Sequence, residues 1–203
     1  MIRNNLALLM VQKQRRVNEI ANETGISRNT ITSTSQNYGK MIQLETINKL
    51  CQSLNVSPTD FFEYVPFDFD YTFDEGELVP GRDYDHGEAF LYNSSLFINV
   101  SANNSRIDTI ELQGSTELEG FNDGYPMIGV SLHPSDNIQL EKLHSYLKQM
   151  SVAFVEDVKK AISNNVETVL TEKNNHTIYP DFLIEFDETR QQFETKIKNR
   201  SVN

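Results

Sequence analysis

The residues best suited to chemistry stand together in the stretch SRNTITS, residues 27–33. An arginine side chain can donate two hydrogen bonds to one guanine edge, and an asparagine side chain can pair in a similar way with adenine. Threonine and serine hydroxyls add contacts that suit any base. The stretch therefore predicts that DNA bases are contacted by Arg28, Asn29, Thr30 and Ser33. The alternative is that these four side chains form a solvated helix face.

The elements around this stretch predict how its side chains are positioned. VNEIANETG, residues 17–25, has apolar residues at helical spacing and ends at Gly25, a typical helix stop. Ser27 then serves as the N-cap of a second helix over residues 28–35. Two helices joined by a tight glycine turn are typical of a helix-turn-helix, whose second helix enters the major groove of DNA.

Polar and basic residues flank the predicted second helix on both sides. Such side chains hold backbone phosphates and fix the register of a protein on DNA without reading its sequence. The helix itself, TITSTSQN after its first turn, has poor helix propensity, so we expect it to be short or frayed. The predicted phosphate contacts are Arg15, Arg16, Asn18, Ser27, Tyr38 and Lys40.

Three further helices are predicted in the first 65 residues. One runs from Ile2 to about Lys13 and another covers residues 44–54. The last begins at SPTD, where Ser57 is the N-cap and Asp60 completes a capping box. Together, the five helices expected in residues 1–65 indicate a compact all-α bundle. The core stripe expected on residues 44–54 consists of Leu44, Ile47, Leu50, Cys51 and Leu54.

These residues also carry a resemblance. The segments EIANETGISRNTI and LETINKLCQSLNVSPTDFF are similar to the Cro/C1 (Xre-type) helix-turn-helix family of bacteria and phages, over residues 1–64. The resemblance implies a transcription regulator, most simply a repressor of phage, plasmid or other mobile-element type, whose partner is double-stranded operator DNA. It also implies a homodimer that binds two half-sites.

The balance of charge separates the two ends of the chain. Residues 1–65 hold seven Lys or Arg and five Asp or Glu, a net charge of +2, whereas the whole chain carries −11. The difference leaves −13 on residues 66–203. We therefore expect two domains with different roles, a helix-turn-helix DNA-binding domain at 1–65 and an acidic domain at 66–203.

The second domain is predicted to have an α+β fold, with antiparallel strands first and helices afterwards. PFDFDYTFDEGE, residues 66–77, alternates aromatic with acidic side chains, the period of a strand with one buried face. Ser135 is expected to cap a helix, a second helix includes residues 154–170, and a charged helix ends the chain at 188–200. Further strands are predicted at 88–92, 95–101, 106–112, 126–132 and 181–186.

Catalysis is not expected from this sequence. Cys51 is the one cysteine, which excludes an intrachain disulfide and favours a buried thiol in the reducing cytoplasm. There is no glycine-rich phosphate loop, and EGFNDGYP is better interpreted as a turn. The sequence thus predicts no enzyme, no cofactor and no metal site. The four histidines, which lack metal-ligand spacing, are His86, His133, His144 and His176.

A cluster of acids near the start of the second domain admits several interpretations. The simplest is a solvated outer face that protects a sheet edge and keeps this domain away from DNA phosphates. A second is mimicry of nucleic acid by a bifunctional autorepressor whose acidic domain inhibits a nucleic-acid enzyme. A third is a ligand-sensing domain, and dimerisation is a further role. The acids are Asp68, Asp70, Asp74, Glu75, Glu77, Asp83, Asp85 and Glu88.

Overall fold

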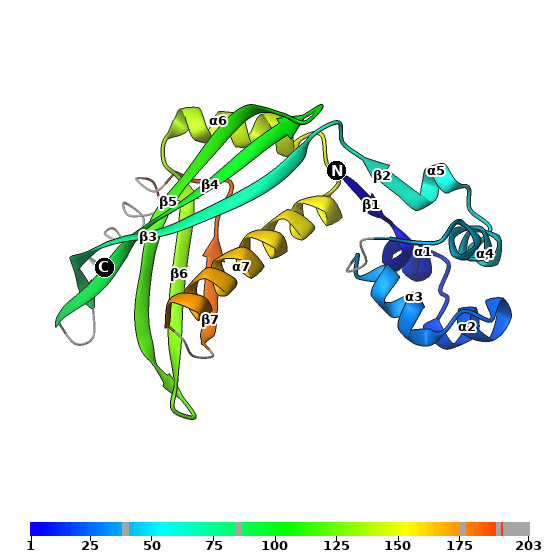
Figure 1. The fold of residues 1–203 in the computed structure, drawn as a ribbon, viewed down its shortest axis with the longest axis horizontal. Coiled ribbons are helices and arrows are strands. Elements are labelled where there is room, and N and C mark those ends of the chain that lie inside the picture. Colours follow the sequence, from blue (N-terminus) through cyan, green and yellow to red (C-terminus); the bar gives the residue numbers. More distant parts are fainter. Residues whose placement is uncertain (38–40, 84–86, 175–177, 190–191, 193–203) are drawn as a thin grey trace, which may run out of the picture. The chain divides into compact units, whose positions relative to one another are not determined.

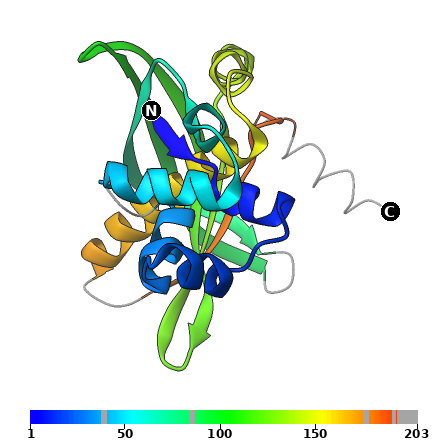
Figure 2. The same cartoon turned by 90° about the vertical axis from the view of Figure 1, so that its right-hand side faces the viewer.

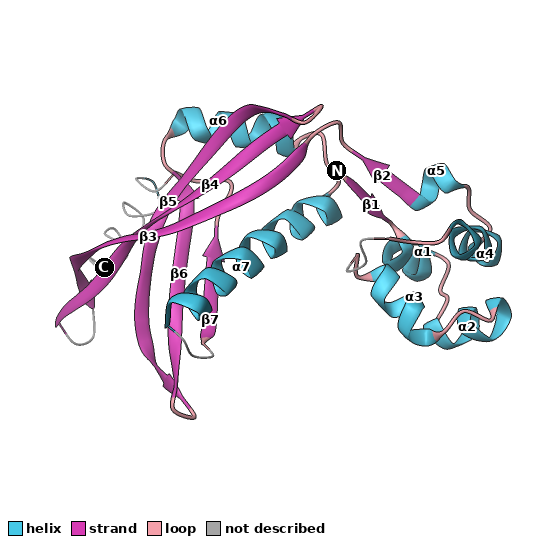
Figure 3. Ribbon diagram, in the orientation of Figure 1, coloured by secondary structure: helices cyan, strands magenta, loops and turns pink. Residues whose placement is uncertain are grey.

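The computed structural model describes residues 1–37, 41–83, 87–174, 178–189 and 192. Within it the chain divides into two compact units, Met1–Pro66 and Phe67–Asn203. Helices dominate the first unit and a large sheet dominates the second (Figure 3). Helical bundle first, then antiparallel strands followed by helices, is the fold class that the sequence predicts.

The first unit packs its helices around one apolar core. Ile20 of α2, Ile31 of α3 and Leu50 of α4 are fully buried, and α2 contacts both α3 and α4. Apolar periodicity therefore places the three central helices where the sequence predicts them. The elements in chain order are β1 (Ile2–Asn4), α1 (Leu6–Gln12), α2 (Val17–Thr24), α3 (Arg28–Ser35), α4 (Leu44–Leu54), α5 (Pro58–Phe61) and β2 (Phe62–Tyr64) (Figure 1).

Two details of the first unit differ from the prediction. The expected helix from Ile2 begins at Leu6, because residues 2–4 pair as a short antiparallel strand with β2. That pairing joins segments 60 residues apart, so local periodicity does not reveal it. Leu44 is 83% exposed and does not belong to the core stripe of α4, whose other members turn inward.

The second unit is built on a five-stranded sheet with strand order β3-β4-β5-β6-β7. The first four strands are antiparallel neighbours, and β7 joins the edge parallel to β6. The predicted strands 88–92 and 95–101 form one continuous strand rather than two. The bounds are β3 (Asp68–Asp83), β4 (Gly87–Ala102), β5 (Ser105–Asn122), β6 (Tyr125–Pro134) and β7 (Tyr179–Ile184).

Two helices precede β7 and cover one face of this curved sheet (Figure 1). In α7 (Val152–Asn174) a stripe at helical spacing, which includes Val158, Ile162 and Val166, is buried against the sheet. α6 (Asn137–Leu147) contacts β5 and β6, and its N-cap is Asp136 rather than the predicted Ser135. The predicted helix at 188–200 falls almost wholly outside the described residues.

Cross-strand register divides the sheet into two faces. We call the helix-covered side the inner face; it carries Phe73, Leu96 and Leu112, which lie opposite one another on three adjacent strands. The other side is the outer face, where Asp68, Asp70 and Asp74 are exposed, as the alternation in 66–77 predicts. The hairpin of β5 and β6 projects at one end of the sheet (Figure 2) and turns at Asp123 and Gly124, within the predicted turn.

Candidate nucleic-acid interface

The two ends of α2 are fixed by hydrogen bonds from backbone N–H groups. The Glu19 carboxylate accepts a hydrogen bond from the backbone N–H of Arg16 at 2.9 Å, which closes the start of α2. Gly25 adopts a φ of 72° and its N–H donates to the Ala21 carbonyl, which ends that helix. A side chain at this φ is strained, so glycine suits the position.

Ser27 caps α3, as predicted. Its hydroxyl oxygen accepts a hydrogen bond from the Thr30 N–H at 3.1 Å, which satisfies one of the unpaired donors of the first turn. Arg28, Asn29, Thr30 and Ser33 are all exposed, whereas Ile31 is fully buried. The structure thus brings the four predicted base-contacting side chains together on the solvent side of one helix.

Two of these four side chains already have local partners. The Thr30 hydroxyl lies 2.8 Å from that of Ser27, and the Ser33 hydroxyl donates to the Thr30 carbonyl at 3.1 Å. Such bonds hold the hydroxyls close to the helix. Thr30 and Ser33 can therefore contact bases only if these local hydrogen bonds are exchanged for hydrogen bonds to DNA.

The far end of α3 is held by a pair of asparagines that sequence reasoning missed. Asn4 on β1 is 4% exposed and donates from Nδ2 to the Thr34 carbonyl and to Asn37 Oδ1, both at 2.7 Å. The Asn4 N–H also donates to Asn37 Oδ1 at 2.8 Å, and in return Asn37 Nδ2 donates to the Asn4 carbonyl at 3.1 Å. These hydrogen bonds join β1 to the end of α3, which runs through Ser35 despite its poor helix propensity.

The predicted phosphate contacts have different surroundings. Arg16 and Asn18 are exposed at the start of α2. Arg15 is half-buried, donates to the Ser53 carbonyl and forms an ion pair with Glu23, whose pKa this hydrogen bond lowers. Arg15 therefore ties α2 to α4 in the isolated chain. Tyr38 and Lys40 lie outside the described residues.

A groove of about 390 Å³ lies between α3 and the start of α4. The side chain of Gln43, the N-cap residue of α4, makes no hydrogen bond to the first turn of that helix. The backbone N–H groups of the first turn therefore suit a phosphate oxygen. The polar side chains of this groove are of the kind that contact DNA, and those on the α4 side were not predicted from the sequence. The groove is lined in part by Ser27, Thr30, Ser33, Gln43 and Thr46.

Comparison with known families now identifies this unit. Residues 5–66 match the family model described as the Cro/C1-type HTH DNA-binding domain. The N-terminal unit is a Cro/C1-type helix-turn-helix domain. Within it α2 and α3, joined by the tight turn at Gly25, have the arrangement of a helix-turn-helix, a motif whose second helix enters the major groove of DNA.

One solved structure is similar to about a third of the chain. A solved structure described as "Crystal structure of a putative DNA-binding protein from Bacteroides fragilis" is 28% identical; the match spans 31% of this chain and all of that one, with a TM-score of 0.29. No curated protein matches the chain.

The other residues with chemically reactive side chains are buried or hydrogen-bonded within the fold, as Cys51, His133 and His144 show. Cys51 is buried, and burial, with a smaller contribution from Asp60, raises the pKa of its thiol. His133 bonds to Ser131 and His144 to the Phe186 carbonyl, while His86 and His176 are outside the described residues. Among the described residues no group of three or more His, Cys, Asp or Glu is arranged to hold a metal ion. In the same part of the chain no helix is long and apolar enough to cross a bilayer.

Proposed function

We propose that this protein is a sequence-specific transcriptional repressor of phage, plasmid or other mobile-element type, which acts in the cytoplasm by binding operator DNA. The observation that carries the proposal is the pair Arg28 and Asn29, exposed on the first turn of a capped recognition helix. These side chains suit guanine and adenine edges in the major groove. The Cro/C1-type domain supports DNA as the partner.

We further propose that the operator is bound by a homodimer, and by binding alone, without catalysis. The recognition helix has eight residues, and residues 1–65 carry a net charge of only +2. Phosphate contacts supply much of the affinity for DNA, so one such domain is a weak binder. Two copies on two half-sites double both the base and the phosphate contacts. The acidic unit would then supply the contact between copies or the regulatory input.

The test is an electrophoretic mobility shift with the DNA upstream of the protein's own gene. Full-length protein and residues 1–66 are compared at two salt concentrations, with circular dichroism to verify that the fragment is folded. Tight, salt-sensitive binding by the full-length protein that drops steeply in the folded fragment supports a repressor dimerised by residues 67–203. Equal binding by both would contradict that role of the second unit. No preference for this DNA over a scrambled duplex would contradict autoregulation at this locus.

The alternative of nucleic-acid mimicry has one observation in its favour. Asp68, Asp70 and Asp74 are exposed on the outer face of β3, spaced two residues or more apart. Glu75, however, turns to the inner face, and the side chains of residues 78–90 lie outside the described part, which leaves the acids at 83, 85 and 88 unplaced. Binding of a basic nuclease or regulator by residues 67–203 would favour this alternative.

A further inference from the structure

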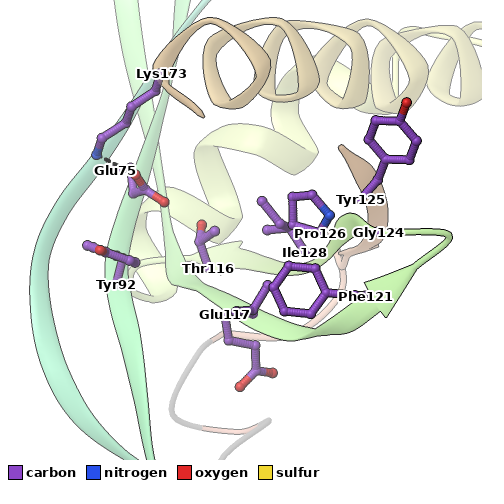
Figure 4. Close-up of a pocket in the computed structure, with 11 residues that line it drawn as sticks. Glu75, Tyr92, Thr116, Glu117, Phe121, Gly124, Tyr125, Pro126, Ile128 and Lys173 are labelled. Atoms are coloured by element: carbon purple, nitrogen blue, oxygen red, sulfur yellow. Dashed lines mark hydrogen bonds and ion pairs between the residues drawn. The ribbon is translucent and has the colours of Figure 1, made fainter. Parts of the chain in front are cut away.

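The inner face of the second unit contains a cavity that the helices do not fill. Its volume is about 710 Å³, within the range of roughly 300–1,000 Å³ typical of small-molecule sites. It lies toward the β5–β6 hairpin, where Thr116 and Ile128 form part of the sheet wall and Lys173 reaches in from the end of α7 (Figure 4).

The charged groups of this cavity neutralise each other. Lys173 forms an ion pair with Glu75, whose side chain is only 8% exposed, across 98 residues of sequence. The Lys173 ammonium also lies 5.4 Å from the ring centroid of Tyr92, a cation-π contact. Figure 4 shows the carboxylate of Glu117 pointing away from Thr116 and Ile128. A charged ligand would therefore meet no uncompensated partner among the described lining side chains.

Most of the remaining lining is aromatic or apolar and unusually exposed. Leu118 is 58%, Phe121 67% and Tyr125 44% exposed, all in the β5–β6 hairpin. The ring of Tyr125 is braced by Tyr179 of β7, with centroids 6.0 Å apart. Apolar side chains gathered at the mouth of a cavity gain free energy when a ligand covers them.

Polar groups at the floor of the cavity can orient a bound ligand. The Thr116 hydroxyl lies 2.7 Å from that of Ser94, and both residues are 2% exposed. The Ser94 hydroxyl donates to the Tyr92 carbonyl at 3.4 Å, so the Thr116 hydroxyl oxygen keeps a lone pair that can accept a hydrogen bond from a ligand N–H or O–H group. An apolar site with a few convergent polar groups is the usual form of a small-molecule pocket.

We propose that this cavity binds an uncharged, predominantly aromatic small molecule with an N–H or O–H group at the end that meets Thr116. Such a site makes the second unit a ligand sensor, one of the roles that the sequence leaves open. The inference stands on the second unit and does not depend on the DNA-binding proposal.

The test uses the neutral dye phenylnaphthylamine and full-length protein. The chain has no tryptophan, so Leu118→Trp and Ile107→Trp each introduce a single one on β5. Both positions are exposed, at 58% and 55%, but Ile107 lies about 35 Å along the strand from Leu118 and does not line the cavity. We expect the dye to bind with one-to-one stoichiometry and to quench the tryptophan at 118 strongly by energy transfer, with little effect at 107.

A second pair of variants covers the case in which tryptophan disturbs the site. Phe121→Ser should weaken dye binding by about tenfold, because an aromatic contact is lost, whereas Ile138→Ser should not. Phe121 and Ile138 are equally exposed, at 67% and 66%, so general surface hydrophobicity is controlled. No saturable binding by the wild-type protein, equal quenching at both tryptophans, or equal losses in both serine variants would overturn the proposal.

The ligand class is tested with anilinonaphthalene sulfonate, the same ring system with an added anion. We expect it to bind about tenfold more weakly than the neutral dye, since Glu75 already occupies Lys173. Tighter binding of the sulfonate would overturn the assignment of an uncharged ligand and identify Lys173 as an anion anchor.

Discussion

Arg28 and Asn29 occupy the first turn of α3, directly after the cap that Ser27 provides. Residues at the N-terminal end of a recognition helix are the ones that reach base edges in the major groove. The hydroxyls of Thr30 and Ser33 are already engaged within the helix, so their contacts with DNA gain less. We therefore expect base discrimination to come chiefly from the arginine and the asparagine.

Removing either side chain should weaken specific binding and leave non-specific binding almost unchanged. Arg28→Ala and Asn29→Ala are each expected to cost about 1–3 kcal/mol on operator DNA, the range for a lost bidentate base contact. Fluorescence anisotropy with operator and scrambled duplexes measures the difference, and Thr32→Ala, exposed on the same helix, is the control. Equal losses on both duplexes would show that these residues contact phosphate instead of bases.

Asp108 on the inner face should contribute pH-dependent stability to the second unit. Burial disfavours its charge, but hydrogen bonds from Lys142 at 2.8 Å, the Thr109 N–H and Tyr146 outweigh burial and lower its pKa. A lowered folded-state pKa gives stability that is present above the unfolded value of about 3.9 and is lost as the pH falls through the folded value.

Asp108→Asn should therefore lower the free energy of unfolding at pH 7 by about 1 kcal/mol and reduce the loss of stability between pH 4 and lower pH. Urea unfolding at several pH values measures both effects. Asp74→Asn, which removes an exposed carboxylate of the outer face, is the control. An unchanged acid dependence in Asp108→Asn would refute this role.

At the scale of elements, short-range sequence signals predict the bounds of α3. They do not reveal pairing between segments that lie far apart in the sequence. Gly25, Ser27 and the Ser57 cap fixed helix ends within one or two residues, because capping chemistry is local. The strand at residues 2–4, the parallel β7 and the hydrogen bonds between Asn4 and Asn37 depend on partners distant in sequence. The cavity was unpredictable for the same reason, since Glu75 and Lys173 meet only in the folded sheet.

The pairing of β5 with β6 depends on a glycine with no room for a side chain. A Cβ added at Gly114 would lie 1.6 Å from the Ser131 carbonyl oxygen, a backbone atom that cannot move without displacing β6. Gly114→Ala should thus lower the free energy of unfolding by about 3 kcal/mol.

Gly129 on β6 provides a matched control for this substitution. There a Cβ would meet the end of the Glu119 side chain at 2.3 Å, and that flexible chain can rotate away. Gly129→Ala should cost less than about 1 kcal/mol. Chemical denaturation compares the two variants, and equal effects would show that the close backbone approach is not what constrains β5.

At the scale of the whole molecule, a weakly basic DNA-binding unit is joined to a strongly acidic one. We expect the negative charge of residues 66–203 to repel phosphates and so to weaken non-specific attraction to DNA. Specific contacts then carry more of the preference for an operator, which favours selectivity over raw affinity.

Neutralising the acids of the outer face should therefore leave operator binding intact or slightly tighter. The triple substitution Asp68→Asn, Asp70→Asn and Asp74→Asn removes three negative charges that the proposal assigns no DNA contact. Anisotropy titrations at low salt, where electrostatic effects are largest, provide the measurement. A collapse of operator binding in a variant that remains folded would contradict the division of roles between the two units.

The central claim, sequence-specific DNA binding through α3, is tested most directly by selection of full-length protein on a pool of random duplexes. We predict enrichment of one motif with two inverted half-sites, containing guanine and adenine positions whose enrichment disappears in the Arg28→Ala, Asn29→Ala double variant. Absence of any enriched motif, or an identical motif selected by the folded double variant, would contradict the account.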